Sequence, residues 1–131
     1  MYTEAASQQN TEIVKLDVGG KLFHTSKSTI MSQDTMLSSL VSERWNPNKD
    51  EYVFIDRDGK HFRKILNFFR DGVISRPNTS EDLEELKREA DFYCIVELSK
   101  LLERYEKSEN AQLGTTIIEH LYKIYTKRSL T

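Results

Sequence analysis

Several features that would narrow the function are nearly absent from this chain of 131 residues, which has one cysteine, two prolines and no long apolar run. Because Cys94 has no second cysteine to pair with, we expect a reducing compartment, the cytosol or the nucleus. Its apolar neighbourhood predicts a buried, unreactive thiol. The longest apolar runs, such as Ile65-Leu66, fall far below the roughly 18 consecutive apolar residues of a membrane span. The N-terminus also lacks the basic and apolar regions of a secretory signal peptide, so we expect neither a membrane span nor export.

A large excess of charge of either sign is also missing, since 19 Lys and Arg residues stand against 21 Asp and Glu residues. The basic residues are spread along the chain and form no stripe, which argues against nucleic acid as a partner. A chain of this length buries roughly two-thirds of the surface that its unfolded form exposes, which is enough for one core. We therefore expect one globular domain, preceded by a flexible segment over residues 1–11, where polar residues predominate.

Catalytic and metal-binding patterns are scarce as well. His24, His61 and His120 fall on three separate predicted elements, and no Cys or His stands two to five residues from another, so we expect no metal site. Asp56 and Asp58 resemble a pair of acid/base carboxylates, but they stand where a helix N-cap is expected. The sequence therefore predicts neither an enzyme nor a cofactor.

The first clear pattern that is present is an alternating run into a double glycine. Val14, Leu16 and Val18 share one face of an extended segment, and charged residues take the other face. Gly19-Gly20 supplies the positive φ angles that a two-residue hairpin turn requires. The pattern predicts an N-terminal β-hairpin over residues 14–26.

The second pattern is a stripe of large apolar residues over residues 62–69, whose helical spacing predicts a helix. The helix is expected to end at Gly72, a candidate left-handed C-terminal cap. Phe68 lies toward the edge of the stripe, where it faces the core or another subunit. Helical positions i, i+3, i+4 and i+7 are occupied by Phe62, Ile65, Leu66 and Phe69.

Between these two patterns, the sequence predicts two short helices, a loop and a strand. Ser26 is expected to cap a short helix, and Asp34 to cap the next one. Residues 42–51 have few apolar side chains and are expected to form a surface loop. Residues 52–55 are β-formers between polar residues, which indicates a strand buried in the sheet.

After the stripe, the chain has three further segments of apolar residues at helical spacing. Glu81 and Asp82 begin the first of them, where the helix dipole favours negative charge. Residues 108–114 are expected to be a connector, and residues 115–131 a separate amphipathic helix that packs on its own domain or on a neighbouring subunit. The alternative is a helix that binds a partner or a membrane surface. The three apolar sets are Leu83, Leu86, Ala90 and Tyr93; Leu98, Leu102 and Tyr105; and Ile117, Leu121, Ile124 and Tyr125.

The two patterns resemble the BTB/POZ domain of the potassium-channel tetramerisation type, in particular the soluble KCTD proteins. The V-G-G and F-x-T signatures of that family are matched at Val18 to Gly20 and at Phe23 to Thr25. Its D-R-x-G-x-x-F and F-x-R-D-G signatures are matched at Asp56 to Phe62 and at Phe68 to Gly72, with QDTML at Gln33 to Leu37 between them. The resemblance implies an α+β BTB/POZ fold over residues 12–107, with a small sheet, an N-terminal hairpin and about five flanking helices.

The same resemblance implies a function in assembly. Members of the family form rings of four or five copies through a largely polar interface, and soluble members serve as cullin-3 ubiquitin-ligase adaptors for a protein substrate. The alternatives are the cytoplasmic tetramerisation domain of a voltage-gated potassium channel, or an assembly scaffold that binds no cullin. Some channel members hold zinc between subunits with a His and several Cys residues, which a single cysteine does not match.

Charged residues that the core does not need are the candidate interface between copies. Trp45, in a polar loop that contains a proline, is the candidate partner-binding residue, because exposed Trp is enriched at interface hot spots. The alternative is that Trp45 packs back on the edge of its own domain. We expect the interface charges on the outward positions of the hairpin and at both ends of the helix that carries the apolar stripe: Lys15, Asp17, Lys21, Arg57, Asp58, Arg70 and Asp71.

Overall fold

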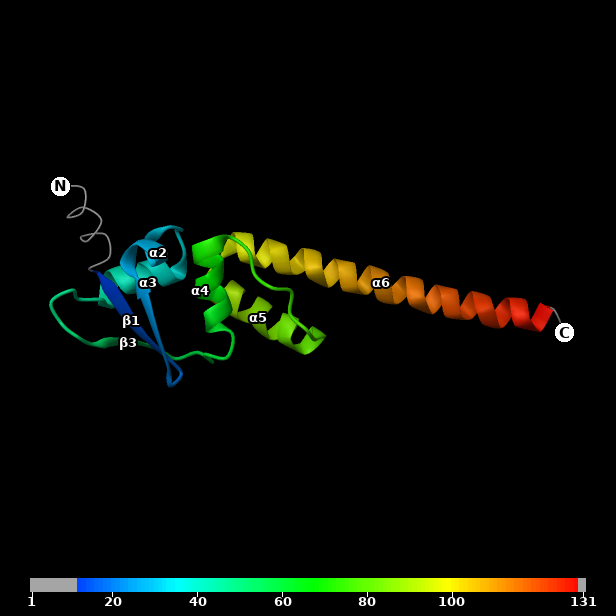
Figure 1. Ribbon diagram of the computed structural model, residues 1–131, viewed down its shortest axis with the longest axis horizontal. Coiled ribbons are helices and arrows are strands. Elements are labelled where there is room, and N and C mark those ends of the chain that lie inside the picture. Colours follow the sequence, from blue (N-terminus) through cyan, green and yellow to red (C-terminus); the bar gives the residue numbers. More distant parts are fainter. Residues whose placement is uncertain (1–11, 130–131) are drawn as a thin grey trace.

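A computed structural model describes residues 12–129, which form a small sheet with five helices (Figure 1). The expected flexible segment over residues 1–11 lies outside this range. In chain order the elements are β1 (Ile13–Val18), β2 (Lys21–Ser26), α2 (Lys27–Met31), α3 (Met36–Arg44), β3 (Tyr52–Ile55), α4 (Phe62–Asp71), α5 (Ser80–Phe92) and α6 (Val96–Ser129).

The sheet has three strands in the order β2-β1-β3, and the predicted hairpin is confirmed. β1 and β2 pair antiparallel around Gly19 and Gly20, whose φ angles are +59° and +98°. Gly19 is required for a second reason, because a Cβ atom there would lie 2.3 Å from the carbonyl oxygen of Arg57. Its backbone N–H donates to the Ile55 carbonyl at 3.0 Å, which joins the hairpin turn to the end of β3.

β3 forms where the sequence predicts a strand, but it is not buried on both sides. It pairs parallel to β1 at the edge of the sheet, so only one face meets the core. Val53 and Ile55 are buried, whereas Tyr52 and Phe54 are exposed. The prediction of a fully buried strand was wrong because a run of β-formers does not by itself tell a buried strand from an edge strand.

The apolar stripe of α4 lies in the core, as predicted. Gly72 ends the helix in the left-handed conformation, with φ of +74°. Phe68 is also buried, so it belongs to the core and leaves no side chain there for another subunit. Tyr93 lies beneath the stripe, with its ring centroid 5.5 Å from that of Phe62. The stripe residues Phe62, Ile65, Leu66 and Phe69 are each at most 7% exposed.

Some of the predicted helix caps are confirmed and others are wrong. Ser26 caps α2 as expected, accepting a hydrogen bond from the Thr29 backbone at 3.1 Å. α3 is capped by Thr35 in a capping box with Ser38, so Asp34 is one residue too early. Neither Asp56 nor Asp58 caps α4. Its N-cap is His61, and Asp58 instead accepts from the Lys60 backbone in the turn before the helix.

Two expected irregular segments are shorter than predicted. α3 continues to Arg44, so the surface loop begins only at Trp45. Residues 108–114, expected to be a connector, are helical, and α6 runs unbroken from Val96 to Ser129 (Figure 1). Polar composition alone does not end a helix, and no proline occurs in this stretch. Although α6 is long, no helix within residues 12–129 is apolar over enough of its length to cross a membrane.

Cys94 is exposed, which corrects the prediction of a buried thiol. It occupies the tight turn between α5 and α6, where its φ of +58° makes it the one residue other than glycine with a positive φ among those described. The turn points the thiol outward while its neighbours Tyr93 and Ile95 are buried. Apolar neighbours in sequence did not indicate burial here because the backbone reverses at this residue.

Candidate functional site

The inner face of the sheet covers the core, and its other face is free within the described chain. We call the free side the outer sheet face. Strand pairing aligns its side chains in rows across the sheet, so residues from three strands form one continuous surface. It consists of Ile13, Lys15 and Asp17 from β1, Leu22 and His24 from β2, and Tyr52 and Phe54 from β3.

One row of this surface is a polar network centred on Lys15. His24 and Tyr52, its two neighbours across the sheet, reach over it to form a hydrogen bond of 3.0 Å. The Lys15 ammonium donates to Asp50 in the loop before β3 and lies 5.6 Å from the centre of the Tyr52 ring. The hydrogen bond from Lys15 lowers the pKa of the Asp50 carboxyl. This row therefore presents charged and aromatic groups held in fixed positions.

The rest of the surface is largely apolar and exposed. Leu22, Phe54 and Ile13 are 59%, 53% and 47% exposed. Asp17 lies between Leu22 and Phe54, and its carboxylate accepts the Gly20 backbone N–H at 2.8 Å. The Lys15 row separates Ile13 from Leu22 and Phe54, so exposed apolar side chains alternate with charged ones across the face. A face that mixes apolar side chains with ordered charges suits a protein interface.

One arginine side chain contacts each edge of the sheet. Arg44 donates to the Phe54 carbonyl at 3.2 Å on the β3 edge. Arg70 reaches from the end of α4 to the His24 carbonyl on the β2 edge, at 3.5 Å, and also binds Asn67 at 3.2 Å. Charged groups at an edge discourage the addition of another strand. The side chains of the outer sheet face are therefore favoured over backbone pairing at the edge as the groups that contact a partner.

Arg57, a predicted interface residue before α4, makes its contacts within its own subunit. Arg57 makes a two-pronged ion pair with Glu89 of α5, with hydrogen bonds of 3.1 and 2.6 Å, and its guanidinium lies 4.3 Å from the centre of the Phe92 ring. Glu89 is buried, and the hydrogen bond that it accepts raises the pKa of Arg57. This pair joins the turn before α4 to α5, so it has a structural role that sequence spacing did not indicate.

The remaining predicted interface residues lie apart from one another. Lys21 begins β2 at the hairpin, beside Gly59. Asp58 is exposed in the turn before α4, and Asp71 is exposed at the other end of that helix. The structure thus brings together Lys15, Asp17 and Arg70 around the sheet, and it does not bring Asp58 or Asp71 to them.

Trp45 is half-buried at the C-terminal end of α3, where it packs against the core. The Lys27 ammonium lies 5.4 Å from the centre of its ring. Trp45 also lines a pocket of about 300 Å³ together with Ile13, Lys15 and Pro47. The predicted partner-binding residue therefore borders the outer sheet face and is not an isolated side chain on a loop.

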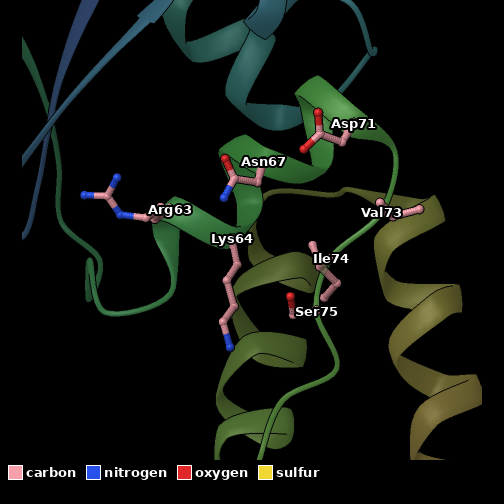
Figure 2. A pocket seen from close by; sticks show the side chains of 7 residues that line it. All are labelled: Arg63, Lys64, Asn67, Asp71, Val73, Ile74 and Ser75. Atoms are coloured by element: carbon pink, nitrogen blue, oxygen red, sulfur yellow. The ribbon is translucent and has the colours of Figure 1, made fainter.

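A second pocket, of about 460 Å³, lies between α4 and the segment that follows it (Figure 2). Arg63 and Lys64 line its basic side, and no ion pair joins either of them to another described residue. Val73, 65% exposed, and Ile74 line its apolar side. Asp71 lines the same pocket, so basic, acidic and apolar groups lie side by side, a mixture that suits a protein segment with both polar and apolar side chains.

A histidine and two acidic residues form a cluster that no spacing in the sequence indicates. His61, Asp82 and Glu85 place one ligand atom each within 4.8 Å of the others. The Lys60 ammonium lies 3.3 Å from Asp82 and 2.9 Å from Glu85, so a cation already contacts both carboxylates. Hydrogen bonds from Lys60 and His61 lower the pKa of Glu85 to about 2. The cluster joins the start of α4 to α5. Its two acidic residues are more than 20 positions from His61 in the sequence, so their spacing did not indicate that the three side chains meet.

Comparison with known proteins gives a family for most of the described chain. Residues 14–103 match the BTB/POZ domain family. FH protein interacting protein FIP2 of Arabidopsis thaliana is 48% identical over 98 residues, which are 70% of this chain and 32% of that protein. Human BTB/POZ domain-containing protein KCTD21 is 38% identical over 120 residues, which are 86% of this chain and 46% of that protein.

A third relative carries a more specific name. The human BTB/POZ domain-containing adapter for CUL3-mediated RhoA degradation protein 2 is 40% identical over 84 residues, which are 63% of this chain and 27% of that protein. The chain thus spans less than half the length of these three curated relatives.

Proposed function

Since the chain belongs to the BTB/POZ domain family, of the potassium-channel tetramerisation type, we propose that it assembles with copies of itself and acts as an adaptor for a cullin-3 ubiquitin ligase. The observation that carries the proposal is the family match over residues 14–103, together with a relative named as an adapter for CUL3-mediated degradation. The substrate is an unidentified protein.

Self-assembly is supported by the outer sheet face. Leu22, Phe54 and Ile13 expose apolar surface on one side of the sheet, beside the ordered charges of Lys15 and Asp17. Apolar contact favours association, and charges at fixed positions select one register between copies. Arg70, against the β2 edge, adds a positive group at the border of the same surface.

Cullin binding is supported by two places that fit a partner protein. One is the pocket beside Trp45, and the other is the pocket lined by Arg63, Lys64, Val73 and Ile74 (Figure 2). We assign the contact first to Trp45, because half-buried aromatic side chains at a pocket rim are frequent hot spots. Val73 is the exposed apolar residue of the second pocket.

Titration calorimetry with an N-terminal fragment of cullin-3 tests the adaptor role. We expect the wild type to bind and Trp45→Ala to lose at least about 2 kcal/mol of binding free energy, the usual loss at a hot spot. Val73→Asp reports on the second pocket. Val96→Asp is its control, since Val96 is similarly exposed but lies at the start of α6. Absence of binding by the wild type would leave an assembly scaffold that binds no cullin.

A further inference from the structure

α6 has two parts with different surroundings. Its first part packs against the body: Leu98 and Leu102 are buried, and Glu106 forms an ion pair of 3.0 Å with Lys87 of α5. Arg76 also donates to the Tyr105 carbonyl at 3.3 Å. The helix then continues past the other elements, and its far half projects away from them (Figure 1). The alternative that this segment packs on its own domain therefore does not hold for the described residues 120–125, all of which are exposed.

The projecting part carries large apolar side chains in water. Leu121 and Tyr125 are 59% and 72% exposed, and Ile124 is 41% exposed. Their spacing of three and four residues puts them on one side of the helix. At 100° per residue Lys123 falls on the opposite side and Tyr122, 68% exposed, on the flank of the apolar side, so the projecting part is amphipathic with a wide apolar side.

The intrinsic helix propensity of its residues does not explain why this part is helical. The sequence before the apolar group contains Gly114, followed by four β-branched residues in a row, Thr115 to Ile118. Both residue types have low helix propensity. Helices without tertiary contacts are marginal in water even when their sequences are favourable. The projecting part therefore requires a partner that packs against its apolar side.

The pattern of apolar residues points to several helices and not to one. In heptad terms Leu121 takes position a, Ile124 takes d and Tyr125 takes e. The sequence has Ile117 and Ile118 four and three residues before Leu121, which are again d and e. A two-stranded coiled coil uses a narrow seam at a and d, whereas an a, d and e stripe is wider and suits a bundle.

The exposed area decides between a separate partner and a second copy. A large aromatic side chain buries roughly 150–250 Å², and the partly exposed Leu121, Ile124 and Tyr125 together offer on the order of 300 Å² per copy. A specific interface needs about 800 Å² per partner, so this stripe is too small to hold two proteins together alone. It fits molecules that another surface already holds close, where the effective concentration is high.

We propose that the projecting halves of α6 from neighbouring copies pack against one another as a parallel bundle, with Leu121, Ile124 and Tyr125 on its inner side. The proposal rests on the self-assembly proposed above, in which the outer sheet face holds the copies together. In a ring with cyclic symmetry, equivalent residues of every α6 lie at the same height along the axis, so a bundle of these helices would be in register. Lys123 remains in water on the outer side of the bundle.

Cross-linking of the full chain tests the bundle. In a Cys94→Ser background, Leu121→Cys places a thiol on the inner side, and Lys123→Cys is the matched control two residues away. With a short bis-maleimide reagent, we expect the Leu121→Cys protein to form covalent dimers and larger species at least about tenfold faster than the control, because proximity raises the effective concentration. Tyr125→Cys is a second reporter, in case a cysteine at position 121 weakens the packing.

Light scattering on the same samples separates the two proposals. An oligomer in which cysteines at 121, 123 and 125 all react at the same slow rate overturns the bundle and leaves self-assembly standing. A monomeric wild type overturns both. Slow cross-linking combined with sedimentation on anionic phospholipid vesicles would assign the helix to a membrane surface instead.

Discussion

At the scale of single residues, two glycines allow the cost of backbone strain to be measured separately from the cost of a steric clash. Gly19 and Gly72 both have positive φ, but an added Cβ atom would lie 2.3 Å from the Arg57 carbonyl oxygen at Gly19 and would meet nothing within 4 Å at Gly72. Gly72→Ala should therefore cost about 1–2 kcal/mol of unfolding free energy, the price of the left-handed conformation. Gly19→Ala should cost roughly 1–3 kcal/mol more, because the neighbouring backbone must move. Chemical denaturation measures both, and equal losses would show that the turn yields without strain.

The ion pairs around Glu85 give a stability change at acidic pH. The pKa of Glu85 in the folded state is about 2, below its ordinary value of 4.5, because Lys60 and His61 donate hydrogen bonds to it. A lowered pKa contributes stability above the ordinary value, and that stability is lost as the pH falls from about 4.5 to about 2.

Glu85→Gln should therefore unfold at lower denaturant than wild type at pH 7, and the difference should vanish near pH 2. Glu84→Gln is the control, since Glu84 is exposed and its nearest cation, Arg88, is 3.7 Å away. If denaturation at several pH values showed the same loss of stability in Glu85→Gln and Glu84→Gln, the contacts of Glu85 with Lys60 and His61 would not be its cause.

At the scale of elements, α4 is the centre of the core. Ile65 is fully buried on the stripe that the sequence predicted. Ile65→Ala should lower the free energy of unfolding by roughly 2–5 kcal/mol, through lost burial and a residual cavity. Arg63→Ala on the exposed side of the same helix should stay within about 0.5 kcal/mol of wild type. Urea denaturation decides it, and a loss at Ile65 no larger than that at Arg63 would place the stripe outside the core.

Local sequence patterns predicted which helices and strands form better than they predicted which side chains are buried. Alternation with Gly19-Gly20 predicted the hairpin, and the four-residue stripe predicted α4 with its cap at Gly72. Burial of β3 was not predictable, because position at a sheet edge depends on the pairing of distant strands. The exposed thiol of Cys94 depends in the same way on a tight turn that composition does not indicate.

The candidate site was predictable only where it follows from strand alternation. Lys15 and Asp17 lie on the outer sheet face, as their outward positions in the hairpin predict. The intrachain pair of Arg57 with Glu89 was not predictable, since the two residues are 32 positions apart and meet only in the folded chain. Trp45 lies at the start of the loop, as predicted, but it is also the C-cap of α3 and packs against the core, because α3 extends as far as Arg44.

At the scale of the whole molecule, Arg70 links α4 to the edge of the proposed interface. Its contact with the His24 carbonyl is long, at 3.5 Å, so the fold should not depend on it. We expect Arg70→Glu to dissociate the assembly while the subunit stays folded, since like charges at an interface cost several kcal/mol. Higher salt should weaken the wild-type assembly for the same electrostatic reason.

Arg63→Glu makes the same charge change on the same helix but away from the sheet edge, so it serves as the control for Arg70→Glu. Size-exclusion chromatography with light scattering reports assembly, and circular dichroism reports helicity. If Arg70→Glu kept its mass, Arg70 would not be an interface residue. Loss of helicity would instead assign it a role in the fold.

The most direct test of self-assembly is the native mass of the wild-type protein, measured by light scattering at near-physiological salt. The subunit has a mass of 15.3 kDa, and a ring of four or five copies should have four or five times that mass. Five copies would favour the soluble adaptor branch of the family, and four the channel branch. A mass of one subunit over the micromolar concentration range would contradict the account.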